Sequence, residues 1–244
     1  MSIYTDLLAA KTASKKKFIV LIDPDHVKLN NLDSIAQMAS DADIDAFFIG
    51  GSLIVNNQMD TAITQLKAIC PKPVILFPGG SLQLSFRADA LLLLSLISGR
   101  NPDLLIGKHV ETATFLRMSP LEIISTGYML IDGGVATSVS YISNTYPIPR
   151  TKDDIAVCTA IAGEMLGLKL IFMDAGSGAL QPISTDMITA VSANISIPLI
   201  VGGGIRTAQK VADNYAAGAD IVVVGNAIEH NPSLIKEMAS VVRG

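Results

Sequence analysis

Two glycine-rich segments lie where an apolar run gives way to a helix pattern. "LIVGGGIRT" (199–207) has three apolar residues, three glycines and a helix start, and "VVVGNAIE" follows the next apolar run in a similar way. Glycine has no Cβ, so backbone N–H groups can approach an anion, and the following helix N-terminus adds partial positive charge. Either loop alone is about equally well explained as a tight turn. Two such loops on consecutive units favour a phosphate site made by Gly203, Gly204, Gly225 and Asn226.

A carboxylate begins the polar part of a third segment, "FMDAGSGA" (172–179). Asp174 follows an apolar run, and Gly176, Ser177 and Gly178 offer N–H groups and a hydroxyl. A carboxylate at a strand end can accept the proton of a substrate hydroxyl, so Asp174 is a candidate general base. Taken alone, an aspartate in this position is more often a turn or helix-capping residue.

Oxygen ligands follow the first two apolar runs. Asp23 opens "DPDH" and Ser52 closes "GGS". Magnesium takes only one or two protein carboxylates and completes its shell with water and substrate phosphates, so this pair predicts a Mg²⁺ site. Hydrogen bonding of the same side chains to their own turns explains them equally well. His109 and His230 are predicted on surface helices, and no Cys/His spacing indicates zinc.

Eight short apolar runs must position these residues. They cover 18–22, 46–49, 74–77, 90–94, 127–131, 170–173, 199–202 and 221–225, and helix patterns cover 32–41, 60–69, 108–118, 153–166, 185–193, 207–217 and 232–242. Strands that are apolar throughout and alternate with helices indicate a parallel sheet buried on both faces. We therefore predict a single-domain (β/α)₈ TIM barrel over residues 1–244, with its active site at the C-terminal ends of the strands.

The third unit of this barrel is irregular. Only residues 78–89, "PGGSLQLSFRAD", separate two of the predicted strands. A parallel crossover normally needs a dozen residues or more and usually contains a helix, while this one starts with Pro and Gly. We expect the third outer helix to be shortened or replaced by a loop.

Composition narrows the class of protein. Half of the 244 residues are apolar, 16% are charged, and the net charge of −4 with no basic block argues against a nucleic-acid partner. Two isolated cysteines, Cys70 and Cys158, and the lack of a signal-peptide pattern fit a reducing cytoplasm. No apolar run is long enough to cross a bilayer.

Taken together, these motifs resemble one enzyme family. "LIDPDH", "FFIGGS", "FPGG", "GYMLIDGG", "FMDAGSGA", "VGGGIRT" and "VVVGNAIE" occur in the order and spacing of the geranylgeranylglyceryl phosphate synthase family, which includes bacterial heptaprenylglyceryl phosphate synthases. The resemblance covers nearly the whole chain. It implies a modified TIM barrel, without the third helix, that joins sn-glycerol 1-phosphate to a polyprenyl diphosphate through an ether bond with Mg²⁺.

The same resemblance assigns the site residues. The metal positions match Asp23 and Ser52. The glycerol phosphate positions match Phe172, Met173, Asp174, Ala175, Gly176, Ser177, Gly178, Gly203, Gly204, Gly225 and Asn226. Geranylgeranyl is the first expectation for the tail and heptaprenyl the second. A lipid substrate and product imply transient contact with a membrane surface, and family habit implies a homo-oligomer.

The chain departs from the family pattern at two of these positions. The usual "YLE" is "FMD", so Phe172 lacks the tyrosine hydroxyl and Asp174 is one methylene shorter than the glutamate expected as base. These changes keep two alternatives open. One is another phosphate-binding barrel enzyme, a sugar-phosphate isomerase or aldolase. The other is a phosphate-ligand binder without catalysis.

Overall fold

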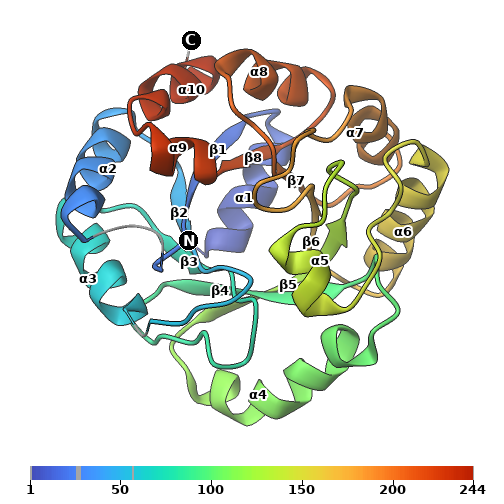
Figure 1. Ribbon diagram of the computed structural model, residues 1–244, viewed down its shortest axis with the longest axis horizontal. Helices are drawn as coiled ribbons and strands as arrows, with labels where there is room; N and C mark the ends of the chain where they lie inside the picture. The colour runs from blue at the N-terminus through green and yellow to red at the C-terminus, as the bar shows by residue number, and fades with distance from the viewer. Residues whose placement is uncertain (1, 26–28, 57, 244) are drawn as a thin grey trace.

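Eight parallel strands close into a barrel in chain order in the computed structural model, which describes residues 2–25, 29–56 and 58–243 (Figure 1). The strands are β1 (Lys17–Ile22), β2 (Ala46–Ile49), β3 (Val74–Leu76), β4 (Ala90–Leu96), β5 (Glu122–Leu130), β6 (Leu170–Asp174), β7 (Leu199–Gly202) and β8 (Ile221–Val224). Because β8 pairs with β1, the sheet has no free edge. The predicted (β/α)₈ barrel is confirmed.

Most strand residues are apolar, which allows both faces of the sheet to be buried. Phe48 and Ile200 point into the barrel, whereas their neighbours Phe47 and Val201 pack outward against the helices. All four side chains have essentially no exposed surface. Each strand therefore contributes to an inner core and to a larger core between sheet and helices.

A ring of helices surrounds the barrel (Figure 1). It contains α2 (Leu29–Asp41), α3 (Met59–Ile69), α4 (Lys108–Met118), α6 (Asp153–Met165), α7 (Thr185–Ser192), α8 (Ala208–Ala216) and α10 (Leu234–Arg243). All seven match predicted helices to within a few residues. None of the helices in the described ranges is both long and apolar enough to cross a bilayer.

Four further elements were not predicted. They are α1 (Ile3–Thr12), the π-helical turn η1 (Asp103–Gly107), α5 (Ser138–Ser143) and α9 (Asn226–His230). Several predicted strand limits also differ from the structure, and β4 runs on to Leu96 instead of ending at residue 94. β5 begins at Glu122 rather than at residue 127, because its polar Glu122, Ser125 and Thr126 hide the strand pattern. β6 extends to Asp174, so this residue ends a strand instead of starting a loop.

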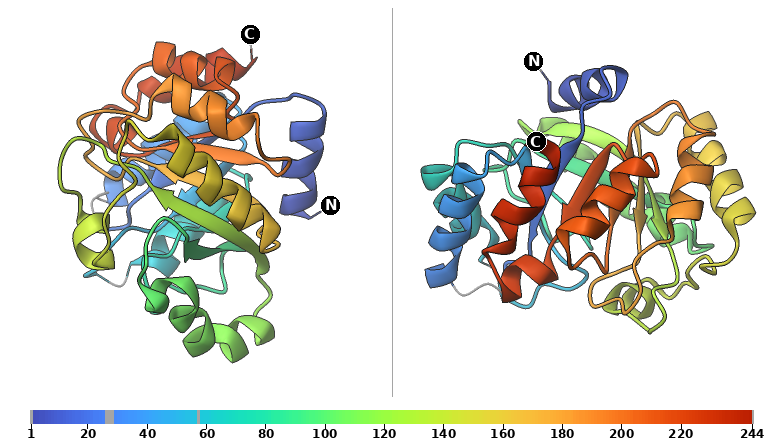
Figure 2. Two further views of the ribbon diagram at one scale, coloured as in Figure 1. Left: turned by 90° about the vertical axis from the view of Figure 1, so that its right-hand side faces the viewer. Right: turned by 90° about the horizontal axis from the view of Figure 1, so that it is seen from above.

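Helix α1 lies at the end of the barrel opposite α5 and α9 (Figure 2). The N–H groups of Ile3 and Tyr4 donate to the carboxylate of Glu122 at 2.6 and 2.9 Å, and Leu7 joins the inner core. This carboxylate satisfies two of the donors that a helix N-terminus leaves free. Helix α1 thereby covers the end of the barrel where the strands begin (Figure 2).

The third unit has no outer helix, as predicted. Residues 77–89 run as turns and loop from β3 to β4, between α3 and α4 (Figure 1). Gln83 holds this segment in place, because its Oε1 accepts the N–H of Gly79 at 3.0 Å and its Nε2 donates to the carbonyl of Gly51 at 2.9 Å. The outer face of β4 is left without a helix from this unit.

Candidate active site

The C-terminal ends of the strands surround a cavity of about 1010 Å³. Most of the predicted site residues line it: Asp23, Ser52, Phe172, Asp174, Gly176, Ser177, Gly178, Gly203, Gly204, Gly225 and Asn226. Met173 and Ala175 do not, because their side chains point into the outer core. Residues far apart in the sequence thus meet at one mouth, as strand polarity requires.

The glycine loop after β7 packs against the loop after β6. Gly203 has a φ of 82°, and a Cβ there would lie 2.5 Å from Oδ1 of Asp174 and 2.6 Å from the N of Ala175. Gly204 has a φ of 69°. Glycine is therefore required at these positions by the left-handed backbone and by the close approach of the two loops, independently of any ligand.

The loops after β6 and β8 are joined by side chains. Ser177 Oγ donates to Asn226 Oδ1 at 2.9 Å, and α9 begins directly at Asn226. Gly176 has a φ of 87°, and a Cβ there would lie 2.8 Å from Thr137 Oγ1. Loops of three consecutive units thus line one part of the cavity.

Asp174 is the buried carboxylate of the cavity, with 8% of its surface exposed. Tyr128 Oη donates to its Oδ2 at 2.6 Å, and the N–H of Gly176 donates to its Oδ1 at 2.8 Å. Burial raises the pKa of Asp174 above its usual value, while these two hydrogen bonds oppose the shift. Burial also raises the pKa of Tyr128, with the nearby carboxylate adding to the effect, so the phenol stays a hydrogen-bond donor.

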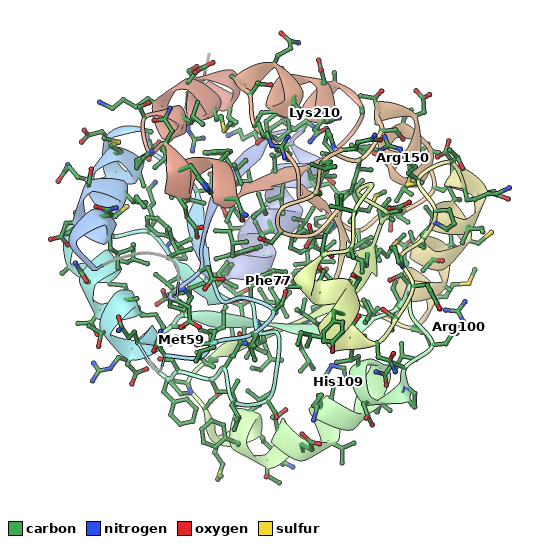
Figure 3. The ribbon with its side chains drawn as sticks, in the orientation of Figure 1. Met59, Phe77, Arg100, His109, Arg150 and Lys210 are labelled. Atoms are coloured by element: carbon green, nitrogen blue, oxygen red, sulfur yellow. The ribbon has the colours of Figure 1, made fainter. Side chains whose placement is uncertain are left out.

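Aromatic rings form the floor beside this carboxylate. The ring of Phe172 stacks on Phe77 at 5.2 Å between centroids and meets Tyr128 edge-on at 5.6 Å. Figure 3 shows Phe77 near the centre of the barrel. The missing hydroxyl at position 172 leaves an apolar ring, and the phenol that faces Asp174 comes from β5 instead.

Asp23 and Ser52 face the cavity from the loops after β1 and β2. Asp23 Oδ1 accepts the N–H of Asp25 at 3.0 Å, as a turn aspartate does, and a Cβ on Gly51 would lie 2.7 Å from its Oδ2. Glycine at position 51 thus lets the carboxylate lie against the second loop. Within the described ranges, no group of three or more His, Cys, Asp or Glu side chains forms a metal cage.

Three further side chains, Asp25, His109 and Glu229, line the cavity although the sequence did not predict them as site residues. Glu229 accepts the N–H of Asp23 at 3.0 Å, and Asp25 accepts N–H groups of Val55 and Asn56. His109 was predicted on a surface helix, but it lines the cavity wall with Nε2 at 2.9 Å from the carbonyl oxygen of Leu94 (Figure 3). His26, which follows Asp25 in the sequence, lies outside the described residues.

The cavity continues as an apolar groove where the third helix is absent. Leu91 and Leu93 of β4 line this part of the cavity, together with Leu84 and Leu116. The loop that replaces a helix therefore joins the polar mouth to a surface that suits a hydrocarbon chain.

Comparison with known proteins identifies the family. The model of the PcrB family matches residues 11–242. The chain belongs to the PcrB family. A geranylgeranylglyceryl phosphate synthase from Chitinophaga pinensis is 57% identical over 240 residues, covering 98% of this chain and 95% of that protein. A synthase of the same name from Thermococcus gammatolerans is 38% identical over 227 residues, covering 93% and 89%.

One solved structure extends this PcrB-family assignment to three dimensions. It is the (S)-3-O-geranylgeranylglyceryl phosphate synthase from Thermoplasma acidophilum in complex with its substrate sn-glycerol-1-phosphate. The two chains are 31% identical, superpose with a TM-score of 0.93, and are covered to 99% and 98%. The likeness includes the whole barrel and its mouth.

Some residues of this PcrB-family site were not predicted from the sequence. Tyr128 had a usable signal, because Ile124, Thr126, Tyr128 and Leu130 alternate at the spacing of inward-facing strand residues. Glu229 had none, because nothing in the sequence indicates that α9 returns its side chain to the loop after β1.

Replacing Gly203 with Ala should destabilise the protein more than the same change at Gly167. Both glycines are left-handed, with φ of 82° and 81°, but a Cβ on Gly167 would meet no atom within 4 Å. Both variants lose about 1–2 kcal/mol from backbone strain, and the crowding beside Asp174 costs Gly203→Ala about 1–3 kcal/mol more. Urea unfolding measures the difference. Equal losses would show that the two loops separate without cost.

Proposed function

We propose that this PcrB-family protein transfers a polyprenyl group from its diphosphate to sn-glycerol 1-phosphate, forming an ether bond and releasing diphosphate. The observation that carries the proposal is one cavity in which a buried carboxylate lies between glycine-loop N–H groups and an apolar groove. The names of the two relatives and the substrate bound in the Thermoplasma structure support the same reaction.

The phosphate of the headgroup binds at the loops after β6, β7 and β8. Backbone N–H groups of these loops, with the side-chain NH₂ of Asn226, offer donors without bringing a bulky side chain into the cavity. The headgroup then extends from Gly204 and Asn226 toward Asp174. This placement brings a glycerol hydroxyl to the only buried carboxylate among the described residues that line the cavity.

Asp174 acts as the general base. The primary hydroxyl oxygen attacks the allylic carbon, the bond from that carbon to the diphosphate oxygen breaks, and the hydroxyl proton moves to the Asp174 carboxylate. Tyr128 donates to the same carboxylate and fixes its position. Because Asp174 is a short side chain held at two points, the headgroup must come to it, and the phosphate loops provide that orientation.

Asp23 and Ser52 would hold Mg²⁺ through a carboxylate and a hydroxyl oxygen, a donor set that suits this hard cation. When bound, Mg²⁺ neutralises charge that develops on the departing diphosphate. Glu229 holds the backbone of Asp23, and Gly51 leaves room for the carboxylate. The protein's own residues therefore set where the diphosphate end of the donor lies.

The prenyl tail follows the groove over β4, past Leu91 and Leu93. Burial of its hydrocarbon surface contributes about 25 cal/mol per Å². We propose geranylgeranyl diphosphate as the donor, with heptaprenyl diphosphate as the second choice. We also propose that residues 1–244 act as one domain in the cytoplasm, as part of a homo-oligomer.

Purified protein with sn-glycerol 1-phosphate, Mg²⁺ and a series of prenyl diphosphates should form an ether product. The prenyl diphosphate that is used with the highest kcat/KM is the preferred donor. Asp174→Asn should lower kcat at least about a hundredfold because the base is lost. Asp154→Asn, which changes an exposed carboxylate on α6, is the matched control. Headgroup binding without product would favour the binder alternative, and turnover of a sugar phosphate would favour an isomerase or aldolase.

Replacing Tyr128 with Phe should lower kcat about tenfold and shift its pH profile. The tyrosine hydrogen bond lowers the pKa of Asp174 against the rise caused by burial. Its loss keeps the base protonated to higher pH, so the acid limb of activity moves up. Adding Phe172→Tyr to this variant returns a phenol to the floor and should restore part of kcat. An acid limb of the kcat profile at the same pH as in wild type would show that Tyr128 does not set the pKa of the base.

Replacing Asp23 with Asn should raise the Mg²⁺ concentration needed for half-maximal activity, with little change in KM for glycerol phosphate. The reason is that a neutral amide binds a hard cation more weakly than a carboxylate. Asp41→Asn, an exposed carboxylate on α2, is the control. The same Mg²⁺ dependence in wild type and Asp23→Asn would remove Asp23 from the metal site.

A further inference from the structure

One aromatic side chain at the barrel centre is less buried than the rings around it. Phe77, the residue after β3, is only partly buried and lines the cavity, whereas Phe48 and Phe172 are 0% and 1% exposed. The centroids of these two rings lie 6.1 and 5.2 Å from that of Phe77, with interplanar angles of 24° and 28°. A ring that only filled the core would be buried like Phe48. Phe77 therefore presents aromatic surface to a molecule in the cavity.

The backbone of Phe77 is fixed against the loop that carries Ser52. Its N–H donates to the carbonyl of Ile49 at 2.9 Å. A Cβ on Gly50, two residues before Ser52, would lie 2.1 Å from the carbonyl oxygen of Phe77, so the two loops are in close contact. The side chain of Phe77 therefore starts from the side of the mouth where we propose that the diphosphate end of the donor lies.

The ring of Phe77 extends toward the side of the mouth that holds the proposed base. It stacks on Phe172, two residues before Asp174 in β6, and its centroid lies 5.9 Å from that of Tyr128, which donates to the Asp174 carboxylate. Figure 3 shows Phe77 near the centre of the barrel. In the proposed reaction the allylic carbon is bonded to a diphosphate oxygen on the Ser52 side and must approach a hydroxyl held by Asp174. The ring of Phe77 therefore lies on the path between these two groups.

The charge that develops on the allylic carbon is positive, because both electrons of its bond to the diphosphate leave with the oxygen. The negative face of an aromatic ring attracts a cation within about 6 Å of the ring centroid, most strongly where water is excluded. Of the described residues that line the cavity, the Lys and Arg side chains are Lys108 on α4 and Arg206 after β7, and neither belongs to the aromatic floor. The ring of Phe77 also has no oxygen or nitrogen able to attack the cation in place of the substrate hydroxyl.

We infer that Phe77 is a catalytic residue whose ring face stabilises an allylic cation as the diphosphate departs, so that bond breaking runs ahead of bond making. This inference rests on the proposed function. The diphosphate oxygen takes the electron pair of the broken bond, the glycerol hydroxyl oxygen then donates a lone pair to the allylic carbon, and the hydroxyl proton passes to Asp174. Phe77 forms no bond in this sequence, and it lowers the energy of the charged state between the two events.

Fluorination of the Phe77 ring tests the inference on the full chain. Each fluorine withdraws electron density from the ring face and changes the ring volume little. Replacing Phe77 with monofluoro-, difluoro- and trifluorophenylalanine should therefore lower the single-turnover rate of ether formation stepwise, by about tenfold or more for the trifluoro ring. The Kd of an unreactive prenyl thiolodiphosphate should not change, because the bound donor carries no positive charge before ionisation. The same series at Phe48, which is fully buried and does not line the cavity, is the matched control and should leave the rate unchanged.

The outcomes separate this inference from the proposed function. Phe77→Leu keeps an apolar side chain without a ring face, and it should slow the single-turnover step at least as much as trifluorination. A rate that does not fall with fluorination of Phe77, or that falls equally with fluorination of Phe48, overturns the inference alone, since the wild type still forms the ether. A Phe77→Leu variant with the wild-type rate also overturns it. Wild type that forms no ether from any prenyl diphosphate overturns the proposed function.

Discussion

The contact between Asp174 and its two hydrogen-bond donors organises the site. A carboxylate with 8% exposure is poorly solvated, so it stays usable as an anion only because Tyr128 and Gly176 donate to it. That arrangement brings the loop after β6 so close to the loop after β7 that position 203 has no room for a side chain. The proposed base and the loops proposed to bind phosphate are therefore parts of one packed unit.

The irregular third unit connects the polar cavity mouth to the groove proposed for the prenyl tail. A complete barrel would cover the outer face of β4 with a helix, but here a loop held by Gln83 leaves Leu91 and Leu93 beside the cavity. Because a loop replaces the third outer helix, the polar mouth and the apolar groove share a boundary.

Much of the fold was predictable from the sequence because the determining signals are local. Mostly apolar strands predicted the barrel, the short connection at 78–89 predicted the missing helix, and the motifs indicated the family. Helix α1 was not predictable, because its acceptor, Glu122, is distant in the sequence. β5 was cut short because its first half mixes polar and apolar residues.

The candidate site was predictable in the same partial way. Residues that follow strands were placed at the mouth, but partners from other strands were not. Tyr128 reaches Asp174 across the β5–β6 pairing, and Glu229 reaches Asp23 across the β8–β1 closure. These contacts depend on barrel closure, which a linear reading of motifs does not contain. The roles of the site residues remain predictions.

The hydrogen bond from Ser177 to Asn226 has one more consequence. It engages the carbonyl oxygen of the amide, so the NH₂ end is the polar group that Asn226 has left to offer. An aspartate of the same shape would accept the serine equally well, yet it would turn a second oxygen, with negative charge, toward the same space. The serine thus sets the polarity of its neighbour, and the isosteric acid would repel the phosphate that we propose to bind there.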